Sequence, residues 1–472
     1  MKQYIILSAL FLVTALMSSC TPDSPEMSAD EFLEVDKPMT YWVNGINKEM
    51  ALAVGSFAEL LDVATDNYRN VYSRSNREFD KPNIQYTDID VENLQRHVGK
   101  LREMSLYALN TIAAHDTPTD EQLADIYTAL AYSYILAGEN FVALPIEENG
   151  RPMVWQEHLR KAVEVLEEAN AKVRLASFKP VCHTLLARAY HRLGNRTAAK
   201  ENAEKALSYD KTFCAMVDFD EANGVVSNIK DRSFSANWWE PLPRLDFLDP
   251  KYQQSAESQR IAYAKAEENY LILAECCAAD GAAVEGFKKD LMDDFFRLVM
   301  SRGAQSFEDD LEMREANATD GTVVNLNTSD WKVRASSEDK FIEGLVLNRS
   351  KGLITVPAVS GTSVDADRMR NAFGKDFLEL VYLLRQEVFF AEGRRFSDLG
   401  MRLPLCEVEA AKVKNRYPDV DVSLFIKAYI PAYLPTEQYG MDAYTVDAAA
   451  GTVTIKYNLN RLVVDSHATA FE

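Results

Sequence analysis

The sequence predicts a mostly α-helical protein in which a frame of antiparallel helix pairs carries long irregular loops and a few short strands. Three observations support this fold class. Apolar residues recur at helical spacing in several segments that end near a glycine. Two long stretches, about 215–255 and 303–372, lack this periodicity, and the second is rich in Gly, Ser, Thr, Asn and Asp. After residue 401, several prolines and short β-like pieces such as 452–459 follow.

The first 36 residues predict export and a lipid anchor. An apolar run at residues 4–17 is shorter than the roughly 20 residues of a transmembrane helix. Small residues then lead to Cys20, an arrangement that resembles a bacterial lipobox. We expect residues 1–19 to be a signal peptide and the Cys20 sulfur to carry a lipid such as palmitate; the alternative is a lipid-free secreted protein with a coincidental cysteine. The acidic residues 20–36 predict an extended, solvated tether.

The clearest helix pair covers residues 183–210. Gly194 and Asn195 separate two segments that each carry an apolar stripe at helical spacing. Small residues on these stripes allow two antiparallel helices to approach closely. The pair resembles a tetratricopeptide repeat, and the matching positions are Ala187, Tyr190, Leu193, Gly194, Ala203, Ala206 and Leu207.

Other segments have the same character and extend the frame. Residues 123–141, which we expect to end a helix at Gly138, and residues 158–173 predict another pair. Residues 263–281 and 377–393 predict further helices. We therefore expect one domain at 37–472, with tetratricopeptide-like helices at about 90–210, 256–300 and 373–400 and variable loops at about 215–255 and 303–372. Stacked pairs of this kind bury a continuous core.

Composition excludes several classes of protein. The 472-residue chain is 47% hydrophobic, as globular proteins are, and its net charge of −21 argues against a phosphate-binding surface for nucleic acid. Beyond Cys20, an odd number of cysteines remains, with no CxxC spacing. We expect these five to be small buried residues rather than a disulfide frame or a metal site; they are Cys182, Cys214, Cys276, Cys277 and Cys406.

No catalytic motif is present in the sequence. HExxH, GxSxG and GxxxxGK[ST] are absent, and the six histidines lack ligand spacing. Residues 217–224 carry Asp218, Asp220 and Asn223, but the third ligand is displaced for a calcium loop. We expect a protein that is not an enzyme and uses neither a metal ion nor a cofactor, although no pair of carboxylates is excluded among 72 acidic residues.

Aromatic residues in the irregular segments are the candidates for ligand binding. A sugar ring stacks on an exposed aromatic ring, and its hydroxyls need polar side chains around it. Trp238 and Trp239, adjacent and just before a proline, are the first choice because two neighbouring tryptophans are hard to bury together. The alternative is that each ring packs its loop onto the frame. Further candidates are Tyr68, Arg69, Tyr72, Asn76 and Trp331.

Three short motifs resemble the SusD/RagB family of outer-membrane nutrient-binding lipoproteins of Bacteroidetes. Residues 392–399, EGRRFSDL, resemble the family's E-G-x-R-x-x-D-L element, in which Arg395 and Asp398 pair with each other or with a neighbouring helix. Residues 268–275 resemble its E-x-Y-L-x-x-A-E element, and Thr65-Asp66-Asn67 its T-D-N element. The order of the motifs, their spread over some 340 residues and the lipoprotein start together identify a divergent member. The physical role of the EG element is expected to be structural, with Gly393 ending a helix.

This resemblance implies a function. Such proteins sit at the outer surface of the outer membrane, anchored by their lipid, above a SusC-like TonB-dependent transporter, and hold an oligosaccharide or other nutrient until it enters the barrel. Three alternatives remain at this point: the same fold with a non-sugar cargo such as a peptide, a surface-tethered glycan-degrading enzyme, and a tetratricopeptide scaffold that binds only proteins. The long loops argue against the scaffold.

Overall fold

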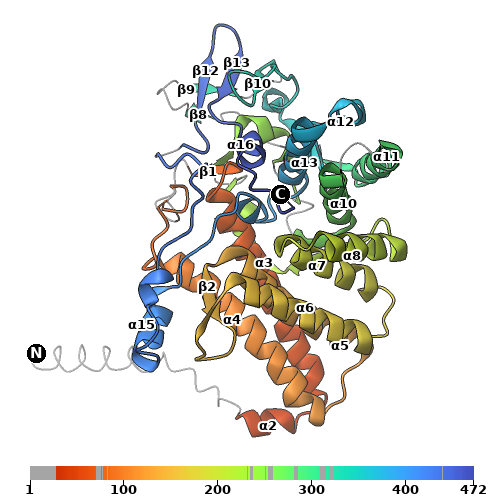
Figure 1. Ribbon diagram of the computed structural model, residues 1–472, viewed down its shortest axis with the longest axis vertical. Coiled ribbons are helices and arrows are strands. Elements are labelled where there is room, and N and C mark those ends of the chain that lie inside the picture. The colour runs from red at the N-terminus through yellow and green to blue at the C-terminus, as the bar shows by residue number, and fades with distance from the viewer. Residues whose placement is uncertain are drawn as a thin grey trace, which may run out of the picture.

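The computed structural model describes residues 28–70, 76, 78–81, 83–230, 232–233, 238–249, 251–252, 259–280, 285–308, 315–317, 323–326, 328, 330–437 and 440–471. Two of the predicted functional residues, Cys20 and Tyr72, lie outside them. The predicted class is confirmed: the fold is mostly α-helical, with few and short strands. Figure 1 shows long helices at one end of the molecule and small sheets at the opposite end.

The first half of the chain forms the helical frame. Each helix packs beside the next one along the chain, from α3 to α8. The helices are α2 (Ala29–Leu33), α3 (Pro38–Val63), α4 (Ile89–Asn110), α5 (Asp120–Asn140), α6 (Trp155–Lys172), α7 (Phe178–Arg192) and α8 (Arg196–Tyr209). The predicted pair at 183–210 is therefore α7 and α8. Gly194 separates them with a φ of +72°, a conformation that glycine adopts without steric cost, and the Asn195 side chain caps α8.

The second half continues the array and adds the loops. Helix α10 packs on α7, α8, α11 and α13, and α13 packs on α16. The helices are α9 (Asn228–Lys230), α10 (Ala266–Asp280), α11 (Glu285–Ser301), α12 (Ala366–Asn371), α13 (Gly374–Val388), α14 (Arg395–Asp398), α15 (Glu407–Arg416) and α16 (Leu459–Asp465). The 3₁₀ helix η4 (Pro243–Leu248) lies within the first variable loop and packs beside β5, β10 and β11, whose bounds follow.

The strands form small separate sheets rather than one large sheet. Antiparallel pairs join β1 (Tyr68–Asn70) with β5 (Trp239–Pro241), β2 (Ala143–Pro145) with β3 (Pro152–Val154), β4 (Cys214–Phe219) with β6 (Gln259–Lys265), β7 (Ala304–Glu308) with β11 (Leu353–Pro357), and β8 (Glu315–Asn317) with β9 (Val323–Asn325). A three-stranded sheet has the order β10 (Lys332–Arg334), β13 (Thr452–Ile455), β12 (Tyr444–Asp447), with β10 parallel to β13.

Tertiary contacts move three of the predicted boundaries. Gly138 does not end α5, which continues to Asn140. Its lack of a side chain instead lets α6 approach, because a Cβ there would lie 2.6 Å from Leu159 Cγ. Residues 263–265 belong to strand β6, so α10 begins only at Ala266. The last part of the predicted tether is not extended: Ser28 caps the short helix α2, and the Phe32 ring lies 5.5 Å from the Trp42 ring.

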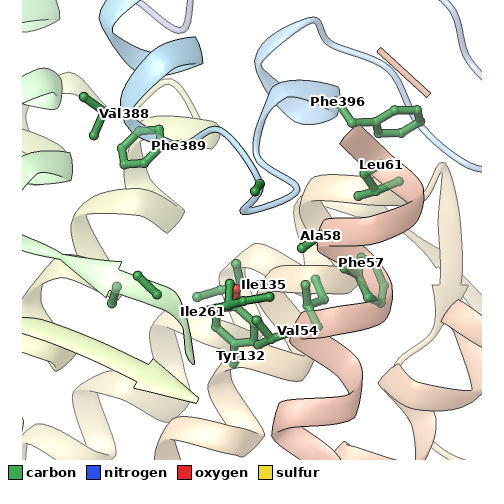
Figure 2. Packing of buried hydrophobic residues seen from close by; sticks show 14 of the residues in the cluster. Val54, Phe57, Ala58, Leu61, Tyr132, Ile135, Ile261, Val388, Phe389 and Phe396 are labelled. Carbon is green, nitrogen blue, oxygen red and sulfur yellow. The ribbon is translucent and has the colours of Figure 1, made fainter. Parts of the chain in front are cut away.

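The core lies where the frame meets the second half of the chain. Figure 2 shows Val54, Phe57 and Leu61 on α3 and Tyr132 and Ile135 on α5. These side chains are all buried. Ile261 of β6 lies beside these side chains in Figure 2, and Phe389, after α13, belongs to the same buried cluster. The two halves therefore share one continuous core.

Two of the short sequence motifs meet in a buried polar network. Arg395 donates two hydrogen bonds to Asp66, at 2.7 and 2.9 Å, so the EG element is tied to the TDN element more than 300 residues away. A third bond runs from Arg395 to the side chain of Asn460, at 2.7 Å. Asn67 accepts a hydrogen bond from Gln386. We call these five residues the motif network; its position explains why distant short motifs occur together.

Other charged residues of the motifs also form buried ion pairs. Glu268 of α10 accepts hydrogen bonds from Arg188, at 2.7 Å, and from Arg394, at 2.8 Å. Burial opposes ionisation of Glu268, but these two guanidinium groups hold its pKa well below the usual range. Asp398 pairs with Arg385 at 2.7 Å. Of the two predicted arrangements for Arg395 and Asp398, pairing with neighbouring elements is the observed one.

Gly393 has a different role from the predicted one. Helix α13 ends at Val388, before the glycine. Gly393 follows in a turn with a φ of +68°, and a Cβ there would lie 2.8 Å from the carbonyl oxygen of Phe57 on α3. The glycine therefore allows this turn to pack against the α3 backbone, which holds the motif network in place.

Candidate ligand-binding site

The structure brings two of the predicted ligand-binding segments together. Strand β1 pairs with β5, so that Arg69 faces Glu240 and Asn70 faces Trp239. The Tyr68 and Trp239 rings lie 6.3 Å apart, and the Tyr68 hydroxyl donates a 2.6 Å hydrogen bond to Asp249. Both rings are buried, with exposed fractions of 1% and 0%. Neither ring offers a face to a ligand, so both act as packing residues here.

Trp238 differs from its neighbour because successive side chains on extended backbone point to opposite sides. Its ring is 43% exposed, and the chain is held there by a 2.7 Å hydrogen bond from its amide to the Arg232 carbonyl. The Arg232 guanidinium lies 5.0 Å from the buried Trp239 ring. As expected for two adjacent tryptophans, the rings are not buried together: Trp239 is buried and Trp238 is exposed.

The remaining predicted residues occupy three different settings. Arg69 is largely buried near Asp442, 3.9 Å away. Asn76 donates a hydrogen bond to Asp90 and accepts one from Arg232, so its side chain organises its own loop. Trp331 is half-buried against the core on the residue before β10. It precedes Val333, which lines the cavity described next, by two residues but does not itself line that cavity.

A cavity of about 580 Å³ opens between the second variable loop, α13 and the residues around α16. In Figure 1, β10, α13 and α16 lie in the upper part of the molecule, away from the long helices of the frame. Its volume falls within the usual range for small-molecule sites. The lining residues used below are Arg244, Arg334, Asp339, Lys340, Phe341, Asp365, Arg368, Glu379, Asn458 and Asn460.

The rim of the cavity is a short loop that presents an aromatic ring. Val333 and Ile342 exchange backbone hydrogen bonds of 2.9 and 2.8 Å, which close the loop between them. Phe341 is 40% exposed at its end. The Arg334 guanidinium lies 4.5 Å from the centre of this ring and donates a 2.9 Å hydrogen bond to Thr454. The ring is therefore held in place while one face remains accessible.

The wall is an ion-paired cluster. Arg461 donates to Asp339 at 2.8 Å and to Glu379 at 3.0 Å. Burial alone would lower the pKa of Arg461, but these two carboxylates raise it above its usual range. Burial also opposes ionisation of Asp339, yet hydrogen bonds from Ser336 and Arg461 hold its pKa below the usual value. Asp339 and Glu379 thus share one guanidinium.

The floor is built from amides and one arginine. Asn458 caps α16 and donates a 2.7 Å hydrogen bond to Glu379. Asn460 belongs to the motif network through Arg395. Arg244, on η4, is 6% exposed and lines the cavity. Burial lowers the pKa of its guanidinium, although the carboxylate of Glu387 nearby opposes this.

Other cavities have less suitable chemistry. One of about 490 Å³ between α4 and α15 is lined largely by charged residues and no aromatic ring. Another of about 610 Å³ is lined by Phe247, Phe296 and Met300 and contains few polar groups. The cavity at Phe341 combines an accessible ring with amides and charges, which is the combination that a polyhydroxylated ligand needs.

The sequence predicted the two variable loops that contribute to this cavity, but not which of their residues line it. Arg244 lies in the loop at 215–255, and Phe341 in the loop at 303–372. Within the described part of the chain, no group of three or more His, Cys, Asp or Glu side chains is placed to hold a metal ion. The five cysteines are free; Cys214 is half-buried and the others are buried. No helix in the described ranges is long and apolar enough to cross a membrane.

No protein-family model matches the sequence. No curated protein matches it either. Among solved structures, a SusD superfamily protein from Bacteroides fragilis overlaps with a TM-score of 0.52 at 13% identity, over 79% of this chain and 97% of that chain. A SusD-like carbohydrate binding protein from Bacteroides fragilis NCTC 9343 overlaps with a TM-score of 0.46 at 11% identity, over 91% of this chain and 98% of that chain. The first comparison establishes that the chain has the fold of the SusD superfamily.

Proposed function

We propose that this protein, which has the SusD-superfamily fold, is a receptor without catalytic activity that binds a glycan at the cell surface and passes it to a SusC-like TonB-dependent transporter. The observation that carries the binding role is the cavity at Phe341. Its ring suits the apolar face of a pyranose, while Asn458 and Glu379 suit hydroxyl groups. The motif resemblance and the fold support the role in nutrient uptake.

The lipid anchor is part of this proposal. The lipobox-like sequence before Cys20 supports acylation of that cysteine and attachment to the outer membrane, with the protein facing the cell exterior. Cys20→Ala in the full-length protein is expected to move it from the membrane fraction to the soluble fraction. Retention of this variant in the membrane fraction, with no lipid found by mass spectrometry, would overturn the anchor.

Binding is tested by titration calorimetry of the full-length protein in detergent against a panel of polysaccharides and oligosaccharides. Phe341→Ala removes the accessible ring and is expected to weaken binding about tenfold, since ring stacking contributes up to about 1.5 kcal/mol. Phe373→Ala is the matched control, because Phe373 is an exposed phenylalanine, 57% accessible, that does not line the cavity.

The outcomes separate the alternatives. Loss of binding in Trp238→Ala but not in Phe341→Ala would place the site at β5 instead of the cavity. Release of shorter sugars during the titration would identify an enzyme. Absence of binding to every glycan would contradict the glycan receptor, and co-purification with a TonB-dependent transporter would then still test the transport role with another cargo such as a peptide.

A further inference from the structure

Arg244 is a buried arginine whose side chain has no partner among the residues that the structure describes. Other deeply buried arginines each pair with a carboxylate: Arg188 with Glu268, Arg349 with Asp246, Arg385 with Asp398 and Arg395 with Asp66. Among the described residues, no hydrogen bond, ion pair or ring contact involves the Arg244 side chain. A buried charge without a partner is costly, so its presence calls for an explanation.

The nearest acids are already engaged by other groups. Glu387 accepts hydrogen bonds from the Thr362 hydroxyl, at 2.6 Å, and from the Ser363 amide, at 2.8 Å. Asp66 is held by Arg395. The guanidinium nitrogens of Arg244 are not among the fully enclosed atoms, so the 6% that stays exposed opens onto the cavity. The free hydrogen-bonding capacity of this side chain therefore faces the cavity.

The charge of the cavity differs from that of the chain as a whole. Four cations line it, and Arg334, Lys340 and Arg368 among them pair with no carboxylate of the described structure. Four acids also line it: Arg461 holds Asp339 and Glu379 and lies 3.9 Å from Glu338, while Asp365 caps the start of α12. With Arg461 the site therefore carries one more positive charge than negative, in a chain whose net charge is −21. The site thus lacks the negative charge that would repel an anion from most of this protein.

We propose that the cavity binds a glycan with an anionic substituent, either the carboxylate of a uronic acid or a sulfate ester, and that Arg244 pairs with this group while Phe341 stacks on the sugar ring. This inference rests on the proposed function. The planar guanidinium fork matches both oxyanions. Because Arg244 is already desolvated and held by the fold, pairing adds little further desolvation of the protein.

The test uses the full-length protein in detergent and chemically matched ligands. Uronic acid oligosaccharides are compared with the same oligosaccharides after reduction of the carboxyl groups to alcohols, and sulfated oligosaccharides with their desulfated forms. The acidic form of one of these pairs is expected to bind at least 30-fold more tightly than its neutral form, since removing one member of a buried charged pair costs about 2 kcal/mol or more. The pair that shows this difference identifies the substituent.

Arg244→Met, which keeps the length of the side chain without its charge, is expected to remove the preference for the acidic form. Arg174→Met is the matched control: it makes the same change at an exposed arginine that does not line the cavity, and it should leave both the affinity and the preference unchanged. A ligand-free measurement adds a second criterion. If Arg244 awaits a ligand, Arg244→Met should leave the melting temperature unchanged or raise it, whereas a structural arginine would lower it.

Each outcome decides the inference. Preference for an acidic glycan that is lost in Arg244→Met but kept in Arg174→Met supports it. Equal binding of acidic and neutral forms, unaffected by Arg244→Met, overturns the inference and leaves the proposed glycan receptor standing. A lower melting temperature of ligand-free Arg244→Met, with an unchanged preference, also overturns it. Absence of binding to all these glycans overturns both the inference and the glycan receptor.

Discussion

Asp66→Asn tests whether the motif network stabilises the fold. The substitution keeps the shape of the side chain but removes its charge and replaces one acceptor oxygen with a donor NH₂ group that faces the Arg395 guanidinium. Arg395 is 1% exposed, so its charge would remain buried with only Asn460 and one amide oxygen as partners. Breaking a buried ion pair in this way costs about 3–5 kcal/mol. We expect the free energy of unfolding to fall by that amount.

The assay is equilibrium unfolding in urea, followed by circular dichroism. Asp419→Asn is the control, because Arg151 and Asp419 form an equally bidentate pair, at 2.7 and 3.1 Å, on the surface. Exposed pairs contribute little to stability, so this control should unfold at the urea concentration of the unmodified protein. If Asp66→Asn also leaves the unfolding midpoint unchanged, the motif network is not the structural element that we describe.

Further predictions concern one glycine, one histidine and one tryptophan. Gly393→Ala should lower the free energy of unfolding by more than about 2 kcal/mol, because the left-handed φ adds about 1–2 kcal/mol to the clash with the Phe57 carbonyl. Gly224 is the control, because it has a similar φ and an added Cβ would meet nothing within 4 Å. In the same urea assay, Gly224→Ala should therefore show only the backbone part of the loss. His158 donates its Nε2 proton to the Leu144 carbonyl at 2.8 Å, its Nδ1 has no partner, and burial lowers its pKa to about 4. Below pH 6.5 this histidine therefore binds a proton in the unfolded chain but not in the folded protein. The free energy of unfolding should fall by about 1.4 kcal/mol per pH unit down to pH 4, about 3 kcal/mol in total. His158→Gln should remove this part of the pH dependence, and an unchanged slope of stability against pH would contradict the burial of a neutral imidazole. Trp239→Ala should destabilise the fold by about 3–5 kcal/mol, whereas Trp238→Ala should leave thermal unfolding unchanged; equal effects would contradict their different burial.

The frame was predictable because periodicity is a local property. The stripe in α7 and α8 is visible in the sequence, and Gly194 and Asn195 end one helix and begin the next for reasons of backbone conformation and capping. The prediction that Gly138 ends a helix was wrong because this glycine makes room for Leu159, which lies on another helix. The end of the tether was misplaced because the packing of Phe32 on Trp42 outweighs the polar composition of its surroundings.

The candidate ligand-binding residues were much less predictable. Trp238 and Trp239 look equivalent in the sequence, and only the pairing of β5 with β1 decides which ring is buried. Phe341 and Arg244 stand in aperiodic loops, where nothing in the sequence distinguishes a ring that faces a cavity from one that packs. That Arg244 has no partner within the described ranges is a property of the assembled cavity, since it depends on which acids other residues have already engaged.

Asn460 belongs both to the motif network and to the lining of the cavity. Its amide oxygen accepts from Arg395 and its NH₂ group donates to Gln386, so both ends of the side chain are fixed by the motif network. The same residue lines the cavity. The motifs therefore fix the position of the cavity floor, while the loops supply Phe341 and Arg244, the residues that we propose select the ligand. If the cavity is the binding site, Asp66→Asn should change ligand affinity through Asn460 even under conditions in which the protein stays folded.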